Sequence, residues 1–313
     1  TLDILVIDEA AYVPDEVYNR VTPMLAATNG QLILISTPFG TANFFYKEFQ
    51  SERFQKWTQT SEDAPHISKD YLAREKERMT SLQYRQEYLG EFVEEGDTLF
   101  PRELIERQML DFDWEYDSAA RLYLGVDVAR FGEDDSTIAF MEKKGHALRI
   151  IRCDVIKGKT RITELAAEIM RLAVQYPTIA RIIIDEAGVG GGLVDILYEK
   201  FGSHKIIGVN NAQRGFEIKG RRKKIIKEDM YMNLLKLLED NRLTIINDVE
   251  ILRSLSSIKL SYSDSGSLLI FGANTHIAEA IIRSIFPLML SGGRGKLWIE
   301  GIEEHKIEDN YFI

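Results

Sequence analysis

The sequence predicts an α/β protein in two parts, a short parallel α/β segment followed by a larger unit of mixed strands and helices. Two apolar runs, at residues 2–8 and 32–36, are typical of parallel strands buried on both faces, and a helical stretch near residues 14–27 separates them. From residue 121 the chain changes to strands joined by short glycine-containing turns, which then alternate with helices. The length of 313 residues suits two domains with sizeable cores.

The composition excludes some classes of protein. No run of about 18 apolar residues occurs, so the sequence predicts no membrane-spanning helix. No charged and apolar leader precedes a cleavage site, and the single cysteine, Cys153, cannot form an internal disulfide. We therefore expect a cytoplasmic protein that is not secreted.

The charge of the chain is acidic overall but basic in one place. With 39 basic and 49 acidic residues, the net charge of −10 argues against a protein that coats nucleic acid by bulk charge. The segment 214–227 nevertheless holds seven basic residues and one acidic residue. It is either a place where the protein grips DNA or a solvated helix face.

The second part has a recognisable order of elements. Strands are predicted at 122–128, 136–142 and 147–155, then a helix at 160–175, a strand at 179–185, a helix at 193–200, a strand at 206–209 and a helix at 221–240. Three antiparallel strands that lead into a parallel α/β half are typical of ribonuclease-H-like folds. A hairpin (256–263 and 267–271) and a helix (276–290) follow. The expected domains are 1–60, a helical and linker segment at 61–118, and 119–313.

The first strand ends in an acidic pair that suits nucleotide chemistry. Asp8 at the end of a buried strand can hold Mg²⁺ beside a nucleotide, and Glu9 can orient an attacking water, as in a Walker B motif. Ser36 and Thr37 end the next strand, where their hydroxyls could sense a γ-phosphate. No phosphate-binding Gly-x-x-x-x-Gly-Lys-Ser/Thr motif occurs, so this chain is not expected to hydrolyse ATP alone.

A second acidic pair is formed by strand-end aspartates far apart in the sequence. Asp127 lies within an apolar strand, near its carboxyl end, and Asp185 ends another such strand before the glycines of 188–192. In the inferred strand order these two strands are neighbours, which brings both carboxylates to one edge of the sheet. Two carboxylates so close require a cation or a shared proton, and oxygen ligands suit Mg²⁺ or Mn²⁺. Such a pair can hold two ions for phosphodiester cleavage.

Further ligands are expected from nearby positions. His276 and Glu279 lie three residues apart at the start of the last amphipathic helix, and either could be the third ligand. Asp134, just beyond the Asp127 strand, is another candidate.

These motifs together resemble those of the large terminase subunits of tailed viruses. The resemblance covers nearly the whole chain, and the segments that carry it are Leu5–Ala10, Ser36–Pro38, Gly125–Ser136, Ile184–Asp185 and His276–Ala280. The resemblance implies a DNA-packaging motor with two domains. The N-terminal domain would be a P-loop-type ATPase that pumps DNA, and the domain after it a ribonuclease-H-like nuclease that cuts concatemers.

The resemblance implies roles for particular residues. Asp8 would bind Mg²⁺, Glu9 would be the catalytic glutamate, and the Ser36–Pro38 segment would couple hydrolysis to movement. Asp127 and Asp185 would be nuclease metal ligands. Where the family often has an aspartate, this chain has Thr275, which leaves Glu279 or His276 to supply the third ligand. The absent phosphate-binding half implies a shortened chain or a split gene.

The implied activity is that of a metal-dependent DNA endonuclease with a partial ATPase segment. Its cofactors would be Mg²⁺ or Mn²⁺ in a two-ion site, and ATP for the full-length motor. Its partners would be double-stranded DNA, a portal protein and a small terminase subunit, in the host cytoplasm and transiently at the procapsid portal, with no membrane. The residues expected to contact the DNA backbone are basic: Lys219, Arg221, Arg222, Lys223 and Lys224.

Two alternatives remain open. The chain could be a non-catalytic packaging or portal-docking module in which Asp127 and Asp185 are vestigial. It could also be a sugar-kinase-like or actin-like ATPase of the same fold, in which the glycines of 188–192 bind phosphate.

Overall fold

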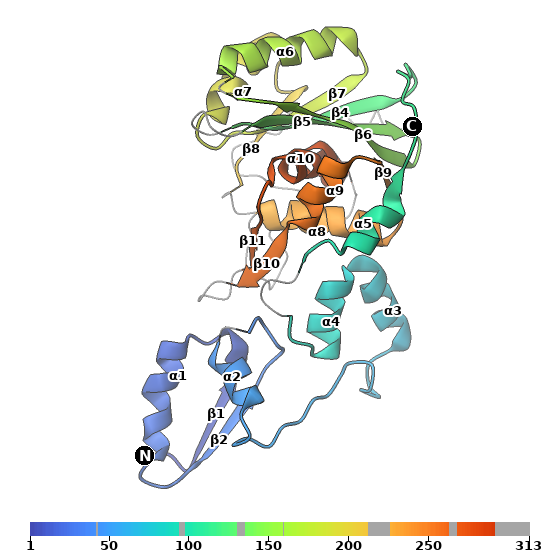
Figure 1. Ribbon diagram of the computed structural model, residues 1–313. Coiled ribbons are helices and arrows are strands. Elements are labelled where there is room, and N and C mark those ends of the chain that lie inside the picture. Colours follow the sequence, from blue (N-terminus) through green and yellow to red (C-terminus); the bar gives the residue numbers. More distant parts are fainter. Residues whose placement is uncertain are drawn as a thin grey trace. The chain divides into compact units, whose positions relative to one another are not determined.

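The computed structural model describes residues 1–41, 43–93, 98–129, 135–158, 160–211, 226–262 and 268–291 (Figure 1). The chain forms two compact units. The first contains Thr1–Phe112 and Leu235–Thr275, and the second contains Asp113–Leu234 and His276–Ile313. The domain limits expected at residues 60 and 118 stay predictions. No helix within the described ranges is long and apolar enough to cross a membrane.

The N-terminal part of the first unit is the predicted parallel α/β segment. Strands β1 (Ile4–Asp8) and β2 (Gln31–Ile35) pair in parallel. Where one helix was expected near residues 14–27, the chain forms α1 (Asp15–Val21) and then a 3₁₀ helix (Thr22–Leu25). The change of helix type coincides with Pro23, which has no backbone N–H to continue an α-helix.

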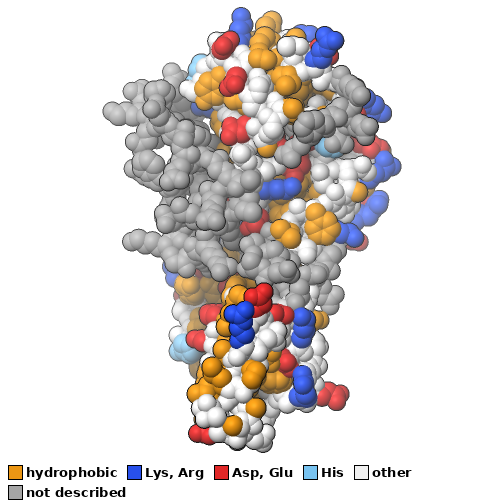
Figure 2. All heavy atoms as spheres, turned by 90° about the vertical axis from the view of Figure 1, so that its left-hand side faces the viewer, with side chains coloured by type: hydrophobic (Ala, Val, Ile, Leu, Met, Phe, Trp, Pro, Cys, Tyr) orange, Lys and Arg blue, Asp and Glu red, His pale blue; other side chains and the backbone are white. Residues whose placement is uncertain are grey.

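The β1–β2 sheet is covered on only one face by described residues. On that face, Ile7 and Leu34 pack against the cluster that contains Phe44 and Phe45 of α2 (Phe44–Gln50). The residues exposed on the strands alternate with these and are apolar: Ile4, Val6, Ile33 and Ile35. The expected burial on both faces is therefore wrong for the described structure. Figure 2 shows hydrophobic side chains between charged ones on the surface of the N-terminal segment, at the bottom of the view.

The remainder of the first unit is mainly helical. Its elements are α3 (Lys69–Arg78), α4 (Ser81–Leu89), α5 (Arg102–Gln108), β3 (Met109–Leu110), β9 (Leu243–Ile246), α9 (Val249–Ser256), β10 (Lys259–Tyr262) and β11 (Leu268–Phe271). The helical character expected from residue 61 is confirmed, but α9 was not predicted. The hairpin strand expected from residue 256 begins at Lys259, because α9 extends to Ser256. Asp248 caps that helix by accepting hydrogen bonds from the N–H groups of Glu250 and Ile251.

The second unit has the predicted order of strands. Its strands are β4 (Arg121–Asp127), β5 (Ser136–Lys144), β6 (Ala147–Ile156), β7 (Ile179–Asp185) and β8 (Ile206–Val209). The neighbours run β6-β5-β4-β7-β8, antiparallel from β6 to β4 and parallel from β4 to β8. The expected pairing of the Asp127 strand with the Asp185 strand is thus confirmed.

Helices cover both faces of this sheet. They are α6 (Ile162–Gln175), α7 (Gly190–Phe201) and α10 (His276–Ser291). A further helix, α8 (Ile226–Glu239), begins in the second unit and ends in the first. Figure 1 shows α6 and α7 on one face of the sheet and α10 on the other. Residues 221–225, expected to begin the α8 helix, lie outside the described residues.

The backbone of α10 lies directly against β4 at a glycine. A Cβ atom at Gly125 would lie 2.0 Å from the carbonyl oxygen of Ala280 and 2.3 Å from the backbone nitrogen of Ser284. No larger residue fits there without a shift of the helix. Gly125 therefore fixes the distance at which α10 crosses the sheet.

We predict that Gly125→Ala destabilises the protein by about 3 kcal/mol, because the added methyl overpacks two backbones that cannot move apart without loss of core contacts. Gly191→Ala is the matched control, since its Cβ would meet nothing closer than 3.5 Å and alanine favours helix α7. Urea denaturation followed by circular dichroism measures both free energies of unfolding. Equal stability of the two variants would contradict the close approach.

Candidate functional site

The candidate site of the second unit lies at the carboxyl ends of two neighbouring parallel strands. Asp127 is the last residue of β4 and Asp185 the last residue of β7, and the pair before them, Val126 and Ile184, are in register. Asp127 is 7% exposed and Asp185 is 5% exposed. Buried carboxylates at these levels of exposure require partners that offset the loss of hydration.

Arg283 of α10 is the partner common to both aspartates. Its Nη1 atom lies 3.3 Å from Asp127 Oδ1, and its Nη2 atom lies 2.9 Å from Asp185 Oδ2. Nη1 also donates to Glu279 at Oε2 (2.9 Å) and at the carbonyl oxygen (2.7 Å), one turn earlier in the helix. One guanidinium thus contacts three carboxylates.

Glu279 is the third carboxylate, and three donors surround it besides Arg283. The Tyr231 hydroxyl donates to Oε1 over 2.9 Å, and Lys227 Nζ lies 2.7 Å from the same oxygen. Asn211 Nδ2 lies 3.5 Å from Oε2. Burial acts to raise the pKa of Glu279, but the charges of Arg283 and Lys227 outweigh it and lower the pKa. Glu279 is therefore held ionised.

Asp127 has a different second partner, His276. The His276 Nδ1 atom lies 2.9 Å from Asp127 Oδ2, and a third of the histidine side chain is exposed. Burial raises the pKa of Asp127, while the hydrogen bond from His276 and the charge of Arg283 act in the opposite direction. His276 was expected as a metal ligand, and in this structure it contacts a predicted ligand instead.

The local sequence of β4 explains why these groups meet. Side chains two residues apart in a strand point to the same face, so Gly125 and Asp127 both face α10. The glycine lets the helix backbone approach, and the aspartate then reaches the side chains of His276 and Arg283.

Arg283, Tyr231 and Asn211 were not predicted as members of the site. The signal for Arg283 is present in the sequence, because it is a charged residue among apolar neighbours (Ile281, Ile282, Ile285) and lies four residues after Glu279. Tyr231 and Asn211 give no comparable signal, since nothing local distinguishes them from other core tyrosines and loop asparagines.

Six of the predicted site residues are not among the residues that the structure describes. Asp134 and the basic residues Lys219, Arg221, Arg222, Lys223 and Lys224 are outside the described residues. In the described part of the chain, no three His, Cys, Asp or Glu side chains form a group arranged to hold a metal ion.

The acidic pair of the first unit lies at one edge of the β1–β2 sheet. Asp8 ends β1, and its Oδ1 accepts from the backbone nitrogen of Glu9 over 3.0 Å. Glu9 has a left-handed backbone with φ of 52°, which is uncommon for a residue with a side chain. At the end of the neighbouring strand, Ser36 Oγ accepts from Ala11 N (3.1 Å) and donates to the carbonyl of Thr37 (2.9 Å).

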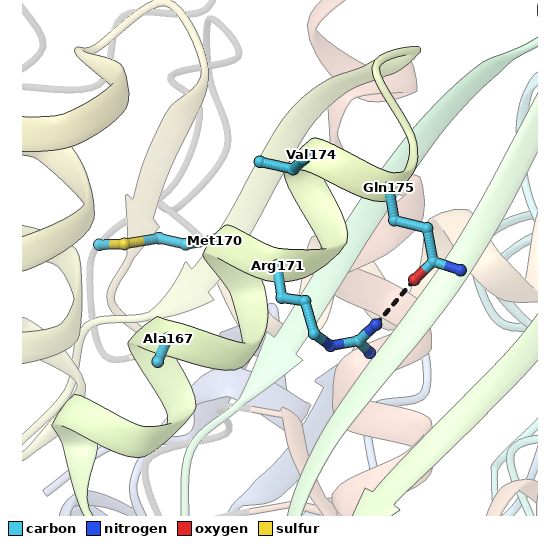
Figure 3. A pocket seen from close by; sticks show the side chains of 5 residues that line it. All are labelled: Ala167, Met170, Arg171, Val174 and Gln175. Carbon is cyan, nitrogen blue, oxygen red and sulfur yellow. Dashed lines mark hydrogen bonds between the residues drawn. The ribbon is translucent and has the colours of Figure 1, made fainter.

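A hollow on the surface of α6 contains none of these groups. Figure 3 shows its lining side chains, which all come from that helix: Ala167, Met170, Arg171, Val174 and Gln175. The Arg171 guanidinium donates to Gln175 Oε1 over 2.8 Å. The hollow is therefore separate from the predicted site.

The second unit has a ribonuclease-H-like fold with three carboxylates gathered at its sheet edge. It follows a parallel α/β segment whose strands end in acidic and hydroxyl residues. Residues 1–107 match the family described as terminase large subunit, T4likevirus-type, N-terminal. A terminase large subunit of Thermus virus P23-45 is 23% identical over 297 residues, covering 85% of this chain and 57% of that protein.

Solved structures have the same fold. The large terminase from a thermophilic bacteriophage gives a TM-score of 0.60 at 15% identity, over 92% of this chain and 69% of that one. The same terminase in complex with ADP gives 0.60 at 16% identity, over 93% and 70%. The resemblance to phage terminase large subunits is therefore confirmed. The chain spans little more than half the length of the curated relative that it matches.

We predict that Tyr231→Phe lowers stability by about 1.5 kcal/mol, because it removes a buried hydrogen bond to the ionised Glu279. Tyr198→Phe on α7 is the matched control, since Tyr198 is 41% exposed, and we expect it to change stability by less than about 0.5 kcal/mol. Thermal or urea unfolding provides the comparison, and an equal effect of the two substitutions would argue against this hydrogen bond.

Proposed function

We propose that this chain is the DNA-cutting part of a phage packaging terminase, a metal-dependent endonuclease that cuts concatemeric DNA. The observation that supports it is the convergence of Asp127, Asp185 and Glu279, from three separate elements, on one buried guanidinium. Three buried carboxylates at one point have no evident role in packing apolar layers, and they suit a site that handles cations.

The donor atoms of the three carboxylates suit a hard divalent cation, although in this structure the carboxylates are arranged around Arg283. All three side chains offer carboxylate oxygens, which suit Mg²⁺ or Mn²⁺ better than zinc. Asp127, Asp185 and Glu279 would hold the ion, which would supply an activated water and a positive charge beside the scissile phosphate. His276 and Tyr231 would keep two of these carboxylates in position through the hydrogen bonds described above.

We predict that this chain nicks supercoiled plasmid in the presence of Mn²⁺, and that Asp127→Asn and Asp185→Asn each reduce the rate by at least about 100-fold. Asp195→Asn, on the exposed side of α7, is the control for loss of one acidic group and should retain the wild-type rate. Conversion of supercoiled to open-circular DNA on gels gives the rates. Equal rates for Asp127→Asn and wild type would contradict the proposal.

A non-catalytic docking module is the second candidate. It is favoured by the guanidinium that already contacts all three carboxylates and by the lack of a three-ligand metal group in the described ranges. A wild-type chain that binds DNA but leaves plasmid intact with Mg²⁺ or Mn²⁺ would support it.

The kinase-like alternative has less support. Gly190 does not require a bound phosphate to explain it, because its Cβ would lie 1.7 Å from the carbonyl oxygen of Asp185, so packing alone favours glycine there.

Residues 1–60 would be the C-terminal part of an ATPase domain. Parallel pairing brings Asp8 and Glu9 to the same sheet edge as Ser36 and Thr37, an arrangement that would suit Mg²⁺ and ATP in the full-length motor. The exposed apolar face of β1–β2 is consistent with a larger sheet domain. A portal protein and a small terminase subunit, met in the host cytoplasm and at the procapsid portal, would be the protein partners.

We predict that replacing Arg221 and Arg222 with alanine weakens DNA binding and lowers the salt slope, because each lost phosphate contact releases about one counterion fewer. The slope of log K against log salt is negative, and its magnitude should decrease by about 2. A double variant of Arg171 and Lys200 removes equal charge from α6 and α7 and should leave the slope unchanged. Fluorescence anisotropy across a salt series measures it, and an unchanged slope in the first variant would contradict the assignment.

A further inference from the structure

Arg283 is a full positive charge in the centre of the proposed metal site. Its side chain is completely buried (0% exposed), and it lies within 3.3 Å of carboxylate oxygens from Asp127, Asp185 and Glu279. It also donates to Asn211 Oδ1 over 3.0 Å. The guanidinium therefore lies between the three carboxylates.

The guanidinium cannot be withdrawn easily from this position. The α10 backbone lies against β4 at Gly125, which places the buried side of the helix directly beside the strand. Burying an arginine is costly unless it is paired, and here the carboxylates provide the pairing. Burial acts to lower the pKa of Arg283, but the negative charges around it outweigh burial and raise the pKa, so it stays protonated. Its Nε atom has no hydrogen-bond partner among the described residues.

The balance of charge limits how many further cations fit. Among the described residues, three carboxylates face the cations Arg283 and Lys227, which leaves one negative charge when all three carboxylates are ionised. His276, which contacts Asp127, removes that negative charge when it is protonated. One divalent ion would therefore already make the net charge of these groups positive. A second divalent ion would leave a large uncompensated positive charge in a buried site, which is strongly unfavourable.

We infer that the Arg283 guanidinium permanently holds one of the two cation positions, so that the site takes one divalent ion and not two. This inference rests on the proposed metal-dependent function and makes its site more specific. It also accounts for the lack of a ready three-ligand group among the described residues, because the carboxylates are held by the guanidinium.

The test counts Mn²⁺ ions bound per chain, by isothermal titration and by the loss of the free Mn²⁺ electron paramagnetic resonance signal. We expect one ion for the wild-type chain and two for Arg283→Gln, whose carboxylates lose their internal cation. Arg171→Gln, which removes an arginine paired with Glu168 on the surface of α6, is the control and should bind one ion.

Thermal unfolding gives a second measurement that does not depend on activity. Without metal, Arg283→Gln should melt about 10 °C below wild type, because it leaves buried carboxylates unpaired. Saturating Mn²⁺ should raise its melting temperature more than that of wild type.

The outcomes separate the inference from the function on which it rests. Two ions in the wild-type chain would overturn the inference and leave the proposed nuclease intact. The same count for wild type and Arg283→Gln would also overturn it. No binding by either chain would overturn both. The wild-type count decides the question even if Arg283→Gln does not fold.

Discussion

A single buried guanidinium joins the elements around the candidate site of the second unit. Arg283 reaches the end of β4, the end of β7 and the first turn of its own helix, and no other described side chain contacts all three carboxylates there. Isolated charges at this depth would be expelled or neutralised. Because they compensate one another, the strand ends and α10 are held in one arrangement.

This arrangement depends in turn on a steric constraint in the backbone. Gly125 allows α10 to touch β4, and Asp127, two residues later on the same face of the strand, meets side chains of that helix. A bulkier residue at position 125 would push the helix away and separate the charges. Packing and electrostatics are therefore coupled at one point of the sheet.

The two units differ in how their sheets are covered. The sheet of the second unit has helices on both faces, and its strand residues Leu124, Val126 and Ile183 are completely buried. The β1–β2 pair of the first unit leaves Val6 and Ile35 exposed. Both sheets nevertheless carry polar groups at the carboxyl ends of parallel strands, which is the usual place for chemistry in α/β proteins.

The sequence by itself predicted the order of strands and helices in the second unit, because strand and helix periodicity are local patterns. That order is typical of a ribonuclease-H-like fold, and through it the meeting of Asp127 with Asp185 could be predicted. The sequence also marked Glu279 as a candidate, through its place at the start of an amphipathic helix. Only the tertiary structure decided that Arg283 stands between these carboxylates and that Tyr231 donates to Glu279. Such contacts join segments that lie far apart in the chain, and their geometry is set by how closely a helix packs on a sheet, which no local pattern encodes.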